Sequence, residues 1–99
     1  MRYHFLMIRS FHDHRTEKIF RRDRVKGVSQ EVQRATLRKL LLIDAADSLN
    51  DLKVPPGNRL EKLKGDRQGQ YSVRVNDQWR ICFTWANGDA AEVEFTDYH

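Results

Sequence analysis

Apolar and polar residues alternate along the C-terminal half of the chain with the two-residue period of a β-strand. In residues 70–75 the odd-numbered positions are aromatic or β-branched and the even-numbered positions are polar. The dipeptide Asn87-Gly88 lies between two such segments and is typical of a tight hairpin. The predicted strands cover residues 58–64, 70–75, 79–85 and 91–95. The pattern therefore predicts an antiparallel meander.

The N-terminal half has the 3.6-residue period of a helix instead. Ser29 is a good N-cap for a helix over about residues 30–46, and Asp13 can cap a shorter helix over about 14–21. The apolar stripe of the longer helix contains Val32, Ala35, Leu40 and Ile43. Residues 7–11 predict a short strand that pairs in the later sheet.

Length and composition fit a single domain. The chain has 99 residues, of which 39% are hydrophobic and 32% are charged, enough for one modest core. Residues 1–99 therefore predict one α+β domain, with an N-terminal strand and two helices packed on a mainly antiparallel C-terminal sheet. Either Met1 or Met7 can be the native start, so residues 1–6 are a candidate N-terminal extension.

The sequence shows no recognisable signal for export or membrane insertion. It contains no run of about 18 apolar residues, and its first residues lack the pattern of a signal peptide. We therefore expect a cytoplasmic protein without a membrane partner. The single cysteine, Cys82, excludes an internal disulfide and lies in an apolar strand, so we expect it to be buried.

Positive charge is concentrated in the N-terminal half. Residues 1–46 hold 11 Lys and Arg against 5 Asp and Glu, whereas residues 47–99 hold 7 against 9. The net charge is +4 and the pI about 9.5. A basic half indicates a polyanionic partner, most simply nucleic acid, with an ordinary solvated surface as the alternative.

Arg80 stands in an otherwise apolar predicted strand. A buried charge without a partner is costly, so Arg80 must reach the open face of the sheet or meet an acid. Its neighbours Trp79, Ile81 and Phe83 then fill the core. In the strand over 58–64, Arg59 and Glu61 share one face, and Lys62 and Lys64 face the other.

The chain ends on a carboxylate, a phenol and an imidazole, in Asp97-Tyr98-His99. The Asn87-Gly88 hairpin brings this end beside the start of the Arg80 strand. Acid–base groups beside a guanidinium suit the cleavage of RNA by its own 2′-OH. A base takes the 2′ proton, a cation stabilises the phosphorane, and an acid protonates the leaving oxygen.

Several segments together resemble the HigB branch of the RelE/ParE toxin superfamily, the killer proteins of plasmid-maintenance systems. The resembling segments are residues 63–67, 71–83, 88–89 and 97–99, with 7–11 and 54–61 fitting the same branch. The resemblance covers about residues 7–99 and is most specific in the C-terminal half. It implies a RelE-like fold.

The resemblance also implies an activity and partners. Members of the branch are ribosome-dependent endoribonucleases that cut mRNA in the A site of the 70S ribosome, without a metal or organic cofactor. Each is paired with a HigA-type antitoxin that carries a helix-turn-helix domain. The complex represses its own operon, so operator DNA is contacted only through the antitoxin.

The resemblance assigns roles residue by residue. Arg80 matches an arginine that contacts the scissile phosphate, and Tyr98 and His99 match a terminal pair shared with YoeB toxins. Some HigB members carry histidine where this chain has Glu61, whereas YoeB toxins carry glutamate there, so the general base is either Glu61 or His99. The candidate catalytic residues are Glu61, Arg80, Asp97, Tyr98 and His99. The candidate phosphate-binding residues are Arg59, Lys62, Lys64 and Arg74.

A second hypothesis is that the chain belongs to the same family but does not cleave RNA. The chain would be a non-catalytic partner of an antitoxin that binds the ribosome or regulates transcription. The departure at Glu61 motivates this alternative. The pair His12 and His14 lacks a third nearby ligand, so we expect no metal site.

Overall fold

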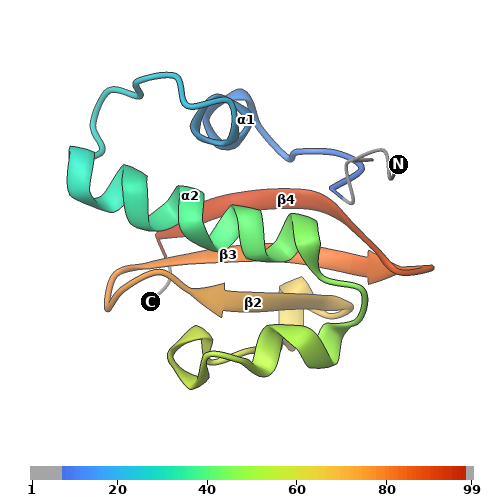
Figure 1. The fold of residues 1–99 in the computed structure, drawn as a ribbon. Coiled ribbons are helices and arrows are strands. Elements are labelled where there is room, and N and C mark those ends of the chain that lie inside the picture. Colours follow the sequence, from blue (N-terminus) through green and yellow to red (C-terminus); the bar gives the residue numbers. More distant parts are fainter. Residues whose placement is uncertain (1–7, 98–99) are drawn as a thin grey trace, which may run out of the picture.

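Four antiparallel strands form a sheet in the order β1-β2-β3-β4, and two helices cover one of its faces (Figure 1). The structure is a computed structural model that describes residues 8–97. The elements are α1 (His14–Phe20), α2 (Gln30–Ala45), β1 (Glu61–Lys62), β2 (Gln70–Arg74), β3 (Trp79–Ala86) and β4 (Asp89–Asp97). No helix within residues 8–97 is long and apolar enough to cross a membrane.

Both helices begin where the sequence predicts. The Asp13 side chain accepts a hydrogen bond from the Thr16 backbone N–H at 2.8 Å, and Ser29 Oγ accepts from the Val32 N–H at 3.1 Å. These caps satisfy amide groups that a helix leaves unbonded at its start. The two predicted helices are confirmed, each ending one residue before the predicted end.

The register of the sheet separates an apolar face from a polar one. Val73 lies opposite Ile81 in the β2–β3 pair, and Ser72 lies opposite Cys82. Neighbouring residues of a strand point to opposite faces, so the two rows face opposite sides. Asn87 and Gly88 have positive φ angles of 55° and 81°, as the tight hairpin turn between β3 and β4 requires.

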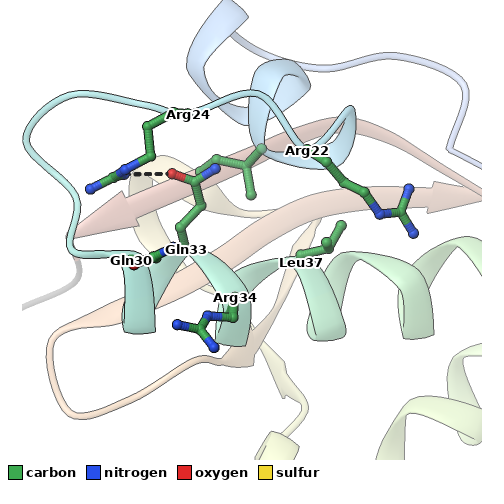
Figure 2. Close-up of a pocket in the computed structure, with 7 residues that line it drawn as sticks. Arg22, Arg24, Gln30, Gln33, Arg34 and Leu37 are labelled. Carbon is green, nitrogen blue, oxygen red and sulfur yellow. Dashed lines mark hydrogen bonds between the residues drawn. The ribbon is translucent and has the colours of Figure 1, made fainter.

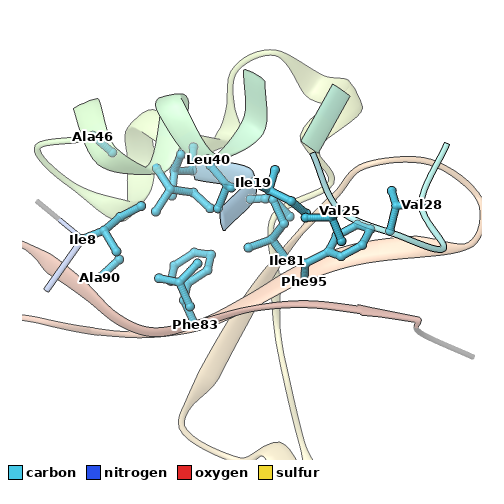
Figure 3. Close-up of a cluster of buried hydrophobic side chains, with 14 residues drawn as sticks. Ile8, Ile19, Val25, Val28, Leu40, Ala46, Ile81, Phe83, Ala90 and Phe95 are labelled. Carbon is cyan, nitrogen blue, oxygen red and sulfur yellow. The ribbon is translucent and has the colours of Figure 1, made fainter. Parts of the chain in front are cut away.

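The core lies between the helices and the sheet (Figure 3). Leu40 of α2 and Ile19 of α1 are fully buried there against Ile81 and Phe83 of β3. The core thus fixes β3 with its odd-numbered side chains toward the helices. Arg80 is left on the opposite face, hereafter the open face.

The predicted strand over residues 7–11 is wrong as a regular strand, although the described part of it does pair with the sheet. Two isolated parallel bridges join it to β4. The ladder is interrupted where Glu92 takes a positive φ of 52° and its N–H bonds to Ser10 Oγ at 2.9 Å instead of to backbone. A bulge of this kind bends a strand away from regular pairing.

The predicted strand over 58–64 is also too long. Only Glu61–Lys62 forms β1. A 3₁₀ turn at Pro56–Asn58 precedes it, Arg59 takes the left-handed conformation with φ 44°, and a second 3₁₀ turn begins at Gly65. Left-handed backbone cannot continue a pleated strand, so the strand starts only after Arg59.

Candidate functional site

Arg80 is held on the open face by groups from two other segments. Its Nε donates to Ser72 Oγ at 2.7 Å, and its Nη2 donates to the backbone carbonyl oxygen of Arg59 at 2.7 Å. The Arg80 side chain is only 10% exposed. Two short bonds on different nitrogens fix the plane of the guanidinium, so its charge points in a set direction.

Glu61 completes this cluster from the edge strand. The β1–β2 register sets Glu61 opposite Ser72, which brings its side chain to the open face. Its Oε2 lies 3.5 Å from Arg80 Nη2, and 53% of the side chain is exposed. The expected proximity of Glu61 and Arg80 is confirmed. The pair joins a buried cation to a carboxylate that solvent or a substrate can reach.

The loop that carries Arg59 is anchored from beneath by Asn58. This residue is fully buried, donates to the carbonyl oxygens of Leu52 at 3.1 Å and Val54 at 3.2 Å, and accepts from Lys39 Nζ of α2. Burial, helped by neighbouring arginines, lowers the pKa of Lys39. The anchor holds the Arg59 carbonyl where Arg80 can donate to it.

The candidate phosphate-binding residues are spread more widely. The register sets Lys62 opposite Tyr71, on the face away from Glu61. Lys64 is exposed before the 3₁₀ turn at Gly65. Arg74 is the register partner of Arg80, and its guanidinium pairs with the exposed Asp77. Only Arg74 and the Arg59 backbone are therefore brought next to Arg80.

Of the C-terminal candidates, Asp97 lies at the predicted end of the sheet. Asp97 is the register partner of Trp79, on the helix side of the sheet, whereas Thr96 pairs with Arg80 on the open face. Asp97 Oδ2 accepts from Gln78 Nε2 at 3.1 Å. The end of β4 therefore lies beside the start of β3, as the hairpin predicts. Tyr98 and His99 lie outside the described residues.

Cys82 is fully buried, as predicted. It is the next open-face residue after Arg80 along β3 and faces Ser72 across the β2–β3 pair. Burial raises the pKa of the Cys82 thiol above its ordinary 9.0. The thiol therefore stays protonated at neutral pH, which makes it a poor nucleophile.

Metal ligands do not gather in the part of the chain that the structure describes. His12 lies 3.9 Å from a carboxylate oxygen of Glu94, and His14 lies 3.7 Å from one of Glu17. Residues 8–97 contain no group of three or more His, Cys, Asp and Glu that could hold an ion. Each histidine is instead the neighbour of one carboxylate.

Sequence reasoning did not assign a role to Ser72 or Asn58. The alternation in residues 70–75 predicts Ser72 on the polar face of its strand, and the antiparallel register then sets it diagonal to Arg80. That register was the available signal. Asn58 gave none, because its three side-chain contacts come from segments 4 to 19 residues away in sequence.

The comparisons with known proteins agree with one another. Residues 9–99 match the family described as the RelE-like toxin of type II toxin–antitoxin system HigB. The chain is 40% identical over 85 residues to Toxin HigB-1 of Vibrio cholerae serotype O1, covering 85% of this chain and 90% of that protein. It is 38% identical over 94 residues to Endoribonuclease HigB of Proteus vulgaris, covering 94% and 100%.

A solved structure supports the same fold. The chain resembles a protein of the YoeB–YefM complex from Staphylococcus aureus with a TM-score of 0.60, over 96% of this chain and 98% of that one. The sequence identity is 22%, so this likeness concerns the fold alone. The predicted α+β fold is confirmed, and the matching family description gives it as RelE-like.

Proposed function

Because the chain belongs to the HigB family of RelE-like toxins of type II toxin–antitoxin systems, we propose that it is a ribosome-dependent endoribonuclease that cleaves mRNA in the ribosomal A site. One observation carries the proposal, namely the fixed guanidinium of Arg80 beside the carboxylate of Glu61 on the open face. The name of the Proteus vulgaris relative, an endoribonuclease, supports it.

The proposed reaction is an internal transfer at phosphorus. The 2′-oxygen attacks the adjacent phosphorus while the bond to the 5′-oxygen breaks, leaving a 2′,3′-cyclic phosphate and a 5′-hydroxyl. One proton leaves the 2′-OH for a base, and one reaches the 5′-oxygen from an acid. Arg80 stabilises the negative charge that builds on the phosphorane oxygens, and its existing bonds keep it oriented during the step. The route uses no metal or organic cofactor.

The proton transfers are assigned to Glu61 and His99. Glu61 takes the 2′ proton, because it is half-exposed and adjoins the arginine that would hold the phosphate. His99 protonates the leaving oxygen, since histidine exchanges protons near neutral pH. Asp97 and Tyr98 orient His99 and the substrate.

Further phosphate contacts come from cations near Arg80 or near Glu61 in the chain. Arg74 is its register neighbour, and Arg59 and Lys64 belong to the exposed segments on either side of Glu61. Lys62 is not included, because the register turns it to the other face. These cations bind phosphates and do not transfer protons.

The proposed partners follow from the family. A HigA-type antitoxin with a helix-turn-helix domain neutralises the chain, and the complex contacts operator DNA through the antitoxin. The type II toxin–antitoxin family and the complex that contains the similar Staphylococcus aureus fold support an antitoxin partner. Action on the 70S ribosome and its mRNA requires a cytoplasmic protein.

The test is a primer-extension map of mRNA after brief induction in bacteria. The wild type should give cuts in phase with the reading frame, which disappear from a transcript without a start codon. Glu61→Gln keeps the shape of the side chain and removes its charge, so it should weaken the cuts at least about tenfold. Arg80→Lys keeps the positive charge but loses the planar guanidinium with its several N–H donors, and we expect a comparable loss of cleavage.

Three outcomes separate the hypotheses. Intact mRNA in cells whose growth has stopped would mean that the chain inhibits the ribosome without catalysis. Cuts that both variants make at the wild-type rate would place the active site elsewhere. Cuts in untranslated transcripts would make the chain a freestanding ribonuclease.

A further inference from the structure

A second concentration of arginine lies on the helix side of the molecule, away from Arg80. A pocket of about 300 Å³ lies between α1, the loop after it and the first half of α2 (Figure 2). Arg22 and Arg24 border it from the loop and Arg34 from α2, with Ile19 and Leu37 as apolar lining. None of the described residues that line it is acidic. The pocket therefore combines positive charge with an apolar floor.

The pocket is built by specific contacts from Gln33. Its Oε1 accepts from Arg24 Nη1 at 2.8 Å and from the Val25 backbone N–H at 3.1 Å, and its Nε2 donates to the carbonyl oxygen of Asp23 at 2.6 Å. These bonds pin the loop to α2, and the dashed line in Figure 2 marks the one to Arg24. The loop backbone and the side chain of Arg24 are thus held before any ligand arrives.

Arg22 occupies a backbone position that favours glycine. The N–H of Asp23 bonds to the carbonyl oxygen of Lys18 at 2.8 Å, and that of Arg22 bonds to Ile19 at 3.0 Å. This is the helix-ending pattern in which the residue after the cap is usually glycine, and Arg22 has a φ of 68°. An arginine held in a conformation that glycine adopts more easily points to a use for its side chain.

We propose that this pocket binds an acidic peptide segment of the antitoxin. One apolar side chain of the segment would lie on the partly exposed Leu37, and carboxylates beside it would pair with the arginines. Arginine binds carboxylates through two parallel hydrogen bonds, and none of the described lining residues supplies a competing carboxylate. The identity of the partner as an antitoxin rests on the proposed function.

The lining favours a peptide over RNA. Protein surfaces that hold single-stranded RNA combine positive charge with aromatic rings on which bases stack. The described residues that line this pocket include no aromatic side chain. An aliphatic floor instead fits a leucine-like or methionine-like side chain, as in grooves that bind one face of a peptide helix.

The first experiment selects ligands without presupposing their sequence. Random nine-residue peptides displayed on phage are selected on the full-length protein and depleted on Arg22→Gln/Arg24→Gln/Arg34→Gln. A matched control, Lys18→Gln/Lys26→Gln/Arg38→Gln, removes the same charge from exposed residues that do not line the pocket. Enriched peptides should carry acidic residues around one apolar residue. Their Kd should rise at least about tenfold on the pocket variant and less than about twofold on the control.

Other outcomes of the selection would overturn the proposal. Failure to enrich any peptide would show that the pocket has no peptide ligand. Peptides without acidic residues, or peptides bound equally by both variants, would show that the pocket arginines do not recognise carboxylates.

A growth assay with the co-expressed antitoxin tests the partner and is independent of the first result. Alone, the wild type and both variants should arrest growth equally, because the pocket lies away from Arg80. With the antitoxin, growth should return for the wild type and the control and stay arrested for the pocket variant. A pocket variant that arrests growth alone and is still neutralised by the antitoxin would refute the proposal. A pocket variant that no longer arrests growth alone would indicate a contact with ribosomal RNA, and the proposal would again be wrong. Absence of arrest by the wild type would contradict the proposed function, while the peptide selection would still decide the role of the pocket.

Discussion

Arg80 and the pocket arginines carry the same side chain in opposite surroundings. Arg80 is almost buried, with its nitrogens bonded to Ser72 and to the Arg59 carbonyl and with Glu61 beside it. Arg22 and Arg34 are exposed at the border of an apolar pocket. A buried guanidinium has already lost its side-chain freedom during folding, whereas an exposed one loses it only when a ligand binds. The first arrangement suits chemistry at a fixed point, and the second suits recognition of a partner.

The two surroundings also differ in what folding requires. Removing a charge from water is unfavourable unless bonds and a counter-charge compensate for it. The fold supplies both to Arg80, through a serine, a left-handed turn and an edge-strand glutamate. Arg34 needs no such support. Mutations should therefore separate stability from binding differently in the two regions.

The largest difference should appear when each arginine is truncated. Arg80→Ala removes charge-assisted bonds from a buried network, so we expect a loss of about 2–4 kcal/mol in the free energy of unfolding. Cleavage in the primer-extension assay should fall at least about 100-fold. Arg34→Ala should change the free energy of unfolding by less than about 0.5 kcal/mol. Urea denaturation of the two variants measures the stability difference.

A similar loss of stability in both variants would refute the contrast between fixed and exposed arginines. If Arg80→Ala proves too unstable to assay, Arg80→Lys serves instead. Lysine keeps the charge but cannot contact Ser72 and the Arg59 carbonyl through two nitrogens at once. Its residual cleavage would then report the orientation of the cation rather than its charge.

Ser72→Ala should have the next largest effect. It leaves the buried Nε of Arg80 without its 2.7 Å acceptor, so we expect about 1–2 kcal/mol of destabilisation. Cleavage should fall about tenfold, because the guanidinium keeps its charge and its bond to Arg59 but loses one restraint. Thr84→Ala is the matched control, because it also removes a hydroxyl from the same sheet, one that donates to the Ala91 carbonyl oxygen. A Ser72→Ala enzyme as active as the wild type would show that Arg80 does not need this restraint.

The sequence predicts well those parts of the fold that depend on neighbours in the chain. Asp13 and Ser29 mark the helix starts because a cap bonds amides two or three residues away. The hairpin at Asn87-Gly88 follows from the φ angles that these two residues accept. With the alternation in β3, it places Arg80 on the open face and the end of β4 beside it.

The parts that could not be predicted depend on contacts between distant segments. The left-handed turn at Arg59 is stabilised by a bond from Arg80, 21 residues away in sequence, and by the anchor at Asn58. Nothing local distinguishes Arg59 from a strand residue. The sequence likewise identifies the pocket arginines only as part of a basic half. The hydrogen bonds of Gln33 that hold the loop join residues 8 to 10 positions apart in the sequence.

Arg22→Gly should change the free energy of unfolding by less than Ser72→Ala does, and should raise it. Glycine adopts the positive φ of this position without steric penalty, so the free energy of unfolding should rise by about 0.5–1 kcal/mol. Binding of the selected peptides should weaken, because one of the three pocket arginines is lost. Thermal denaturation and a peptide titration check the two halves of this prediction. A variant that is both more stable and equally able to bind would remove Arg22 from the pocket's function.

The smallest expected effect concerns whether water reaches the thiol of Cys82, the residue that follows Arg80 on the same face of β3. Burial raises the pKa of Cys82 above 9.0 in the folded state, so above that pH the unfolded chain ionises its thiol first and binds fewer protons. Stability should therefore fall as the pH rises through this range. Lys39 acts in the opposite sense, because its lowered pKa makes the folded state release a proton before the unfolded chain does. The difference between the wild type and Cys82→Ala isolates the thiol.

That difference should grow in favour of Cys82→Ala as the pH is raised from 8 to 10.5, whatever constant loss the missing sulfur atom causes. Urea denaturation at several pH values measures it. Parallel curves for the two proteins would mean that water reaches the thiol in the folded state. Water would then also reach the surroundings of Arg80. Solvent would screen its guanidinium as it screens the guanidinium groups of the pocket arginines.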